Sequence, residues 1–258
     1  MHSITSSIRR AATNSNVGKR TAIDGARRRR LYLFRHGSVD YVNSDGSFVP
    51  DPDVVDLNAR GVSQAEAMAS LFDGVHVDRA VCSGLPRTVQ TAEFVLGARD
   101  VSLERNPGFE EIRPAKGESA GGYDIVTDIA FSHWRAEDPE ARFLGGETYT
   151  GFYDRIVSAT LDMLAEDDWD NLAVFAHGGT NSAILGWVTG IGLKGFGLVD
   201  QATCCLNIID FDLGADGSVK RQVVRGMNIT ADDPVMRYRD HGDMEALAKR
   251  LLSFEPQD

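Results

Sequence analysis

The amino-acid sequence predicts an α/β protein, a three-layer αβα sandwich around a mostly parallel central sheet. Short apolar stretches at 31–34, 79–82 and 172–176 are each followed within three residues by a glycine, which indicates strands that end in tight turns. The third stretch has no polar alternation and therefore reads as a strand buried on both faces. Stretches of helical periodicity lie between these strands. This alternation predicts parallel strands with helices on both faces of the sheet.

Two helices are expected after the first two strands. In 57–72, apolar residues recur at the spacing of one helical face, and Asn58 is suited to be the N-cap. In 83–96, Ser83 is the expected cap and Pro86 suits the first turn.

From residue 98 onward, the sequence predicts a loop-rich segment followed by further helices and a strand hairpin. Residues 98–146 contain many prolines and glycines, which predicts loops with one short helix near 125–134. Helices are expected at 147–166, 180–188 and 244–252. Strands at 203–211 and 219–225 flank a turn at 214–217 and predict an antiparallel hairpin at the edge of the sheet.

Charge is distributed unevenly along the chain. Residues 1–30 hold eight of the 27 basic residues and one of the 38 acidic residues, although the net charge of the chain is −11. We expect 1–30 to be a disordered basic leader and 31–258 to form a single domain. Because the domain is strongly acidic, it repels polyanions, and we expect no nucleic-acid partner.

Other function classes are disfavoured by what the sequence lacks. No apolar run approaches the roughly 20 residues that cross a bilayer, so we expect no membrane partner. Three cysteines without CxxC spacing (Cys82, Cys204 and Cys205) predict reduced thiols and a cytoplasmic location. No histidine and carboxylate spacing supports a metal site, and we expect neither a metal nor another cofactor.

Histidine and arginine gather where the predicted strands end. Arg35-His36-Gly37 follows the first strand, Ser83 to Arg87 follows the second, and His177-Gly178 follows the third. Ligands bind at the carboxyl ends of the strands in such sheets. Arginine presents a fork of donors that matches phosphate oxygens, and glycine lets a ligand approach the backbone closely. The pattern predicts a small cationic pocket for a phosphate dianion.

These segments resemble the motifs of the histidine phosphatase superfamily, also called phosphoglycerate mutase-like. The resemblance runs in chain order through six segments: Arg35-His36-Gly37, 57–65, 83–92, 109–112, 145–148 and 176–179. Any one tripeptide is weak evidence, whereas six motifs in order are a strong signal. The resemblance implies a phosphoglycerate mutase-like fold and a phosphomonoester hydrolase that acts on a small phosphorylated metabolite.

The resemblance also implies residue roles. His36 would attack phosphorus and carry the phosphoryl group, while Arg35, Arg87 and His177 would hold its oxygens. Gly37, Ser38 and Gly178 would line the phosphate site. Glu111 would give a proton to the leaving oxygen and then help water to attack, with its neighbour Glu110 left open as an alternative acid. An activity profile with an acidic and a basic limb is expected.

Three alternatives stay open. The family's mutases use the same histidine, but they carry glutamate and serine after RHG, where this chain has Ser38 and Val39. The domain could also be a phospholigand-binding or regulatory module without turnover. A phosphoprotein or protein-histidine phosphatase is the third alternative, for which we expect a wide, open pocket.

Overall fold

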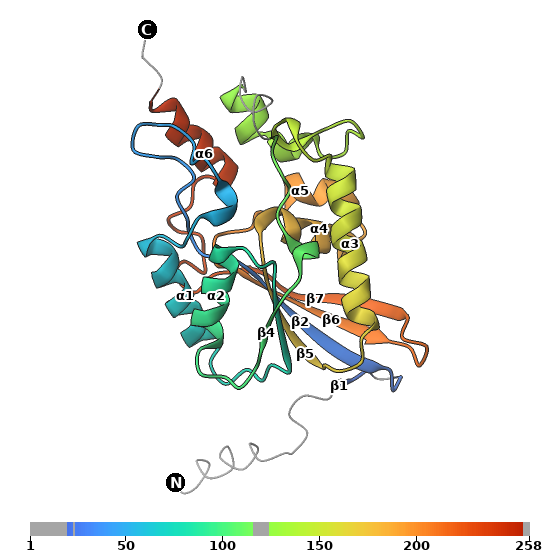
Figure 1. The fold of residues 1–258 in the computed structure, drawn as a ribbon. Helices are drawn as coiled ribbons and strands as arrows, with labels where there is room; N and C mark the ends of the chain where they lie inside the picture. The colour runs from blue at the N-terminus through green and yellow to red at the C-terminus, as the bar shows by residue number, and fades with distance from the viewer. Residues whose placement is uncertain (1–19, 23, 116–123, 255–258) are drawn as a thin grey trace, which may run out of the picture.

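The computed structural model describes residues 20–22, 24–115 and 124–254, and it confirms the α/β fold (Figure 1). Seven strands in this part of the chain form one sheet, with the order β4-β3-β5-β2-β6-β7 and the short β1 beside β2. Strands β2 to β5 are mutually parallel where they pair, and β6 and β7 form the predicted antiparallel edge hairpin. The strands are β1 Arg20–Thr21, β2 Arg27–Arg35, β3 Arg79–Cys82, β4 Leu103–Arg105, β5 Asn171–Ala176, β6 Leu206–Leu213 and β7 Val219–Ile229.

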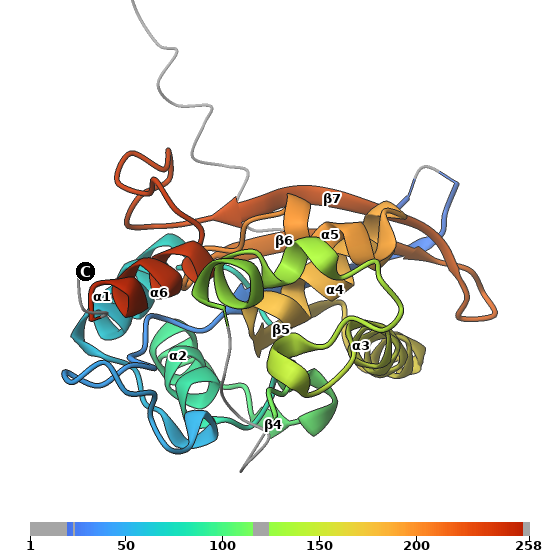
Figure 2. The same cartoon turned by 90° about the horizontal axis from the view of Figure 1, so that it is seen from above.

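Helices connect these strands and cover both faces of the sheet (Figure 2). The α-helices are α1 Ala59–Leu71, α2 Pro86–Leu96, α3 Tyr149–Ala165, α4 Gly178–Thr189, α5 Gly195–Leu198 and α6 Asp243–Leu252. Short turns of other helix types are η1 Pro52–Val54, η2 Pro107–Phe109, η4 Ile125–Ala130, η5 Ser132–Arg135, η6 Phe143–Gly145 and η7 Gly192–Lys194. No described helix is both long and apolar enough to cross a membrane.

Two hydrophobic cores lie on opposite faces of the sheet. Alternate residues of β2 point to opposite faces, so Leu31 and Leu33 pack with α3 and α4, whereas Tyr32 and Phe34 pack with α1 and α2. All six residues of β5 are buried, which confirms the strand predicted to be covered on both sides. This arrangement confirms the three-layer sandwich.

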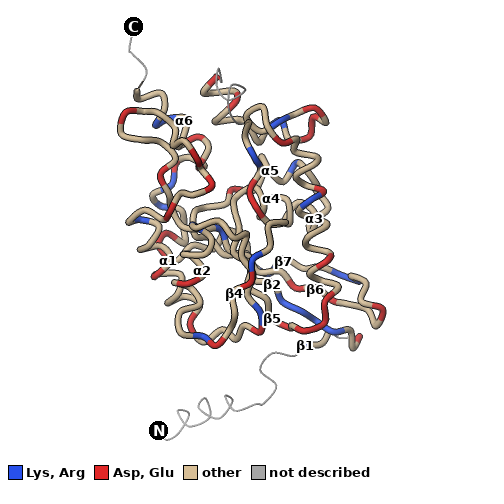
Figure 3. The backbone as a smooth tube through the Cα atoms, in the orientation of Figure 1, with Lys and Arg blue, Asp and Glu red and all other residues tan. Residues whose placement is uncertain are grey.

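The N-terminal boundary differs from the expected one. Strand β2 begins at Arg27, so the arginine run that we assigned to a disordered leader belongs to the sheet. The register places Arg28 opposite Asp212 and Arg30 opposite Asp210, and the charged groups lie 2.6 and 2.7 Å apart. The two aspartates that neutralise these arginines belong to β6, far away in the sequence, so the residues next to the arginine run gave no sign of them. Residues 1–19 and 23 of the expected leader lie outside the described residues. Figure 3 shows the basic start of β2 within the sheet.

The helix starts were predicted with mixed success. Asn58 is the N-cap of α1, because its side-chain oxygen accepts the Gly61 N–H at 2.9 Å. Ser83 is not the cap of α2: the N-cap is Leu85, and Pro86 opens the helix. The short helix expected near 125–134 is the π-helical turn η4 followed by the 3₁₀ turn η5.

Candidate active site

Three polar residues follow three neighbouring strands and meet at one edge of the sheet. His36 follows β2, Ser83 follows β3 and His177 follows β5, and these strands lie side by side in the order β3-β5-β2. All three side chains are buried. The imidazole rings of His36 and His177 have centroids 5.2 Å apart and stand edge to face at 65°. The structure therefore brings together the two histidines that the sequence singled out.

The tautomer of His36 is set by a backbone carbonyl. Its Nδ1 lies 2.7 Å from the carbonyl oxygen of Gly37, which can only accept a hydrogen bond. Nδ1 must therefore carry the proton, and in the neutral ring the lone pair is on Nε2. This arrangement leaves His36 Nε2 available as a nucleophile.

His177 is held by a serine that the sequence analysis had placed elsewhere. Its Nε2 lies 2.9 Å from the Ser83 hydroxyl, and its Nδ1 is buried with no hydrogen-bond partner among the described residues. When Ser83 donates its proton to Nε2, the neutral ring carries its own proton on Nδ1. His177 can then donate that N–H to an oxygen of a bound group.

Two arginines, Arg87 buried and Arg35 partly buried, each have an Nε atom that is unpaired among the described residues. In Arg35, the last residue of β2, Nη1 donates to the Gln201 carbonyl and to the Asp243 carboxylate. In Arg87, at the start of α2, Nη1 donates to the Pro52 carbonyl at 2.8 Å. The Nε atom of each arginine is buried and unpaired within the described part of the chain. Buried donors of this kind are costly unless a ligand satisfies them, and planar forks suit phosphoryl oxygens.

The electrostatic environment keeps both histidines neutral. Burial lowers the pKa of His36 and of His177 well below the ordinary value, and the guanidiniums of Arg87 and Arg35 lower both pKa values further. A neutral His36 retains the lone pair that attacks an electrophile. The positive charge of the site therefore comes from arginines, which stay charged, rather than from histidines.

The structure separates Glu111 from Glu110. Glu111 accepts hydrogen bonds from the N–H groups of Gly179 and Ile112, each at 3.0 Å, and lies at the N-terminus of α4 beside the histidines. Glu110 pairs instead with Arg113 at 2.6 Å. Glu111 is thus the carboxyl group held by α4, whereas Glu110, which lines the same cavity, is engaged in an ion pair with Arg113.

Glycines permit the close packing around the site. A Cβ on Gly37 would lie 2.7 Å from the Gly61 carbonyl oxygen, and one on Gly178 would lie 3.3 Å from the Arg35 guanidinium. Ser38 lines the cavity, and its N–H donates to Gln64 at 3.0 Å. Ser38 and Gly178 line the cavity, whereas Gly37, in the turn after β2, packs against Gly61 and is not among the residues that line it.

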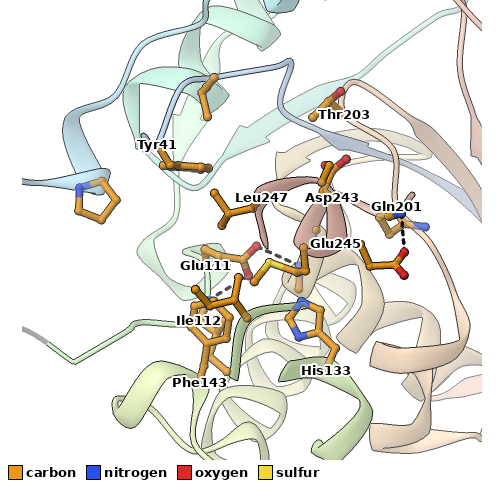
Figure 4. Close-up of a pocket in the computed structure, with 18 of the residues that line it drawn as sticks. Tyr41, Glu111, Ile112, His133, Phe143, Gln201, Thr203, Asp243, Glu245 and Leu247 are labelled. Atoms are coloured by element: carbon orange, nitrogen blue, oxygen red, sulfur yellow. Dashed lines mark hydrogen bonds between the residues drawn. The ribbon is translucent and has the colours of Figure 1, made fainter. Parts of the chain in front are cut away.

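These groups open into a cavity of about 1410 Å³ in the described structure. Figure 4 shows Tyr41, Glu111, His133 and Asp243 around it. Tyr41 faces the Arg87 guanidinium, 5.8 Å from its ring centroid, and Asp243 comes from the C-terminal helix α6. His133 is partly buried, lies 3.0 Å from the Tyr149 hydroxyl, and has a pKa lowered to about 4 by desolvation and by Arg35. Of the residues named here, Glu111 and Arg87 were assigned to the site from the sequence, whereas Tyr41, His133 and Asp243 were not.

Comparison with known proteins identifies the pattern. A family model described as "Histidine phosphatase superfamily (branch 1)" matches residues 31–223. An adenosylcobalamin/alpha-ribazole phosphatase of Escherichia coli is 29% identical over 167 residues, which cover 63% of this chain and 80% of that protein. A probable 2-carboxy-D-arabinitol-1-phosphatase of Arabidopsis thaliana is 26% identical over 216 residues, which cover 80% of this chain but 43% of that protein.

Solved structures agree on the fold. A mycobacterial glucosyl-3-phosphoglycerate phosphatase superimposes with a TM-score of 0.64 at 21% identity, covering 78% of this chain and 99% of that one. At this identity the likeness is evidence for the fold alone. The family match ends at residue 223, so α6 and its contacts with the site lie beyond the matched region.

Proposed function

Because the chain belongs to the histidine phosphatase superfamily, branch 1, and is a phosphomonoesterase of that family, we propose that it hydrolyses the phosphate ester of a small metabolite through a phosphorylated His36. One observation carries this proposal. A neutral histidine with its lone pair on Nε2 lies beside a second histidine and two arginines whose buried Nε atoms have no partner in the described structure. These groups match the needs of phosphoryl transfer, which are an aligned nucleophile and fixed positive charge.

In the proposed first step, His36 Nε2 forms a bond to phosphorus and the bond from phosphorus to the ester oxygen breaks. Glu111 gives its proton to the departing oxygen, so the organic product leaves as an alcohol. Arg35, Arg87 and His177 donate to the phosphoryl oxygens while charge shifts onto them.

In the proposed second step, water attacks the phosphorus and the bond to Nε2 breaks. Glu111, now a carboxylate, takes the proton from the attacking water. Inorganic phosphate leaves, and His36 returns to its neutral state. The two steps use one carboxyl group first as an acid and then as a base.

The cavity bears on the substrate. Its volume of about 1410 Å³ exceeds the roughly 300–1,000 Å³ that is typical of small-molecule sites. The lining includes aromatic side chains such as Phe131, Trp134 and Phe143. These features support a substrate with an organic group much larger than the phosphate. The volume also favours a phosphoprotein as a second candidate, because a wide pocket is what such a substrate needs.

A screen of phosphomonoesters tests the proposal. Because relatives are named for ribazole and sugar-acid phosphates, the panel should contain nucleotide-like, sugar and amino-acid phosphates together with a phosphopeptide. We expect phosphate release from at least one metabolite and none from the His36→Ala variant. Isomerisation of phosphoglycerate without net phosphate release would instead support a mutase. Tight ligand binding with no turnover on any substrate would support a binding module.

The remaining expectations stay predictions from the sequence. They are a cytoplasmic location, the absence of a nucleic-acid or membrane partner, and a reaction that needs no metal or other cofactor.

A further inference from the structure

The C-terminal helix α6 reaches the phosphate-binding end of the sheet. Asp243, the first residue of α6, forms an ion pair with Arg35, the last residue of β2, across a sequence separation of 208 residues. Asp243 also pairs with Arg239 at 3.1 Å. Figure 1 shows α6 at this end of the molecule, and Figure 4 shows Asp243 among the residues that line the cavity. A residue outside the family-matched region thus contacts a residue inside the site.

The contact uses the edge of Arg35 that faces away from its binding fork. Asp243 and the Gln201 carbonyl both engage Nη1, while Nε is buried and has no partner in the described residues. In this protein Arg28 and Arg30 bind carboxylates with the Nε and Nη2 pair. That pair is the fork that suits two oxygens of one anion. Asp243 therefore leaves free the edge that would hold a phosphoryl group.

Arg87 provides an internal comparison. Its Nη1 is also engaged, by the Pro52 carbonyl, and its Nε is also buried without a partner in the described chain. Both arginines are thus held by the same atom and present the same fork. The difference is that a neutral carbonyl holds Arg87, whereas a charged side chain from a separate helix takes part in holding Arg35.

The position of α6 depends on contacts that do not involve Arg35. Ala248 and Leu251 pack with Val42 and Ile129 in an apolar cluster between α6, the loop after β2 and η4. Arg250 donates to the Val42 carbonyl at 2.8 Å and pairs with Asp40 at 3.2 Å. Because these contacts hold α6 in place independently of Arg35, they also fix the position of Asp243 beside Arg35.

We propose that Asp243 is a positioning residue for the phosphatase reaction: it holds the Nη1 edge of Arg35 so that the Nε and Nη2 fork faces the phosphoryl group. This inference rests on the proposed function, since it assumes that Arg35 binds the phosphoryl oxygens. It makes the C-terminal helix a working part of the active site. The competing view is that Asp243 occupies the place of the substrate and inhibits the enzyme.

The two views predict opposite changes in phosphate affinity. If Asp243 orients Arg35, Asp243→Asn weakens inorganic phosphate as an inhibitor, because the fork loses its alignment. If Asp243 competes with phosphate, the same substitution removes a negative charge and strengthens inhibition. We expect kcat/KM to fall about tenfold and the inhibition constant of phosphate to rise, as is usual for the loss of a charge-assisted hydrogen bond.

A double-mutant cycle separates positioning from a general effect on folding. Kinetics and phosphate binding by calorimetry are measured for the wild type, Asp243→Asn, Arg35→Ala and the double variant. We expect Asp243→Asn to have almost no further effect once Arg35 is removed, because it acts through that side chain. Asp216 is an exposed acid in the turn between β6 and β7, at the end of β6 that lies away from the active site. Asp216→Asn makes the same charge change there and should leave both the kinetics and the phosphate affinity unchanged.

Each outcome decides the inference. Tighter phosphate binding by Asp243→Asn, or an equal loss with and without Arg35, overturns the positioning role. Calorimetry keeps this test distinct from the proposed function: a wild type that binds phosphate but hydrolyses no ester refutes the proposed function, and the effect of Asp243 on phosphate binding can still be read.

Discussion

His36 Nδ1 lies 2.7 Å from the carbonyl oxygen of Gly37, and this single contact determines which nitrogen of His36 can react. The carbonyl accepts the Nδ1 proton, so the lone pair of the neutral ring is on Nε2. Burial and the neighbouring Arg87 and Arg35 lower the pKa of His36 and so favour the neutral form. Backbone geometry and electrostatics therefore both favour a neutral His36 with its lone pair on Nε2, which is what the proposed role as nucleophile requires.

The lowered pKa of His36 predicts a histidine that does not titrate near neutrality. As pH falls through about 6.5, an ordinary imidazole takes up a proton, whereas His36 in the folded protein stays neutral. In NMR spectra of the ligand-free protein, we expect the His36 ring signals to be constant from about pH 8 to 6. In the urea-unfolded chain the same signals should shift with a midpoint near 6.5. A folded-state midpoint at or above 6.5 would contradict this account.

Removal of the Glu111 carboxyl should affect substrates according to their leaving groups. Glu111→Gln cannot give a proton to the ester oxygen, so hydrolysis of alkyl phosphates should slow by about 10²–10⁴. A nitrophenyl phosphate, whose leaving group needs no proton, should lose far less in its phosphorylation step. Rapid-quench kinetics on both substrates measures the difference.

Glu110→Gln is the matched control for this experiment. Glu110 forms a partly exposed ion pair with Arg113, and such pairs contribute little. Its loss should leave both rates within about twofold, corresponding to a few tenths of a kcal/mol. A larger loss of rate from Glu110→Gln than from Glu111→Gln would show that Glu110, and not Glu111, is the general acid.

Gly179→Ala should reproduce part of the Glu111 defect. A Cβ at this position would lie 2.4 Å from Glu111 Oε1, so the carboxylate must move away from the start of α4. Because that neighbour is the end of a flexible side chain, the fold should survive. We expect slower hydrolysis of alkyl phosphates with little change in melting temperature. In a Glu111→Gln background the alanine should add little, and an equally large second loss would show that it acts elsewhere.

His133 should make the protein less stable in mild acid. Its pKa is lowered to about 4 in the folded state, so as pH falls below about 6.5 the unfolded chain takes up a proton that the folded protein does not. Stability is therefore lost as pH falls from about 6.5 towards 4. Between pH 7 and pH 5 this group alone should cost about 2 kcal/mol of unfolding free energy. Urea unfolding of the wild type and of His133→Gln at both pH values measures this loss. The variant should lose less unfolding free energy between pH 7 and pH 5, and an equal loss would contradict a neutral His133 in the folded protein.

Much of the fold and the centre of the site could be predicted because their signals are local. His177 directly follows the apolar end of β5, His36 follows the apolar run 31–34 after one arginine, and the carboxyl ends of parallel strands meet. Burial of β5 on both faces could be predicted from its unbroken apolar sequence. These features depend on neighbours in sequence, which a single sequence displays.

The remaining features depend on partners far away in the chain. The Arg27 to Arg30 run resembled a solvated leader, because the acids that pair with Arg28 and Arg30 belong to β6. Ser83 looked like a helix cap, because its contact with His177 comes from another strand. The pairing of Arg35 with Asp243 had no sequence signal at all.

The most direct test of the central claim is to isolate the phosphorylated intermediate. The protein is mixed with a reactive aryl phosphate, quenched within milliseconds under alkaline conditions that preserve phosphohistidine, and analysed by peptide mass spectrometry and ³¹P NMR. The account predicts one phosphoryl group on Nε2 of His36 in the wild type and none in His36→Ala. A phosphoryl group on another residue or on Nδ1, or continued turnover by the alanine variant, would contradict it.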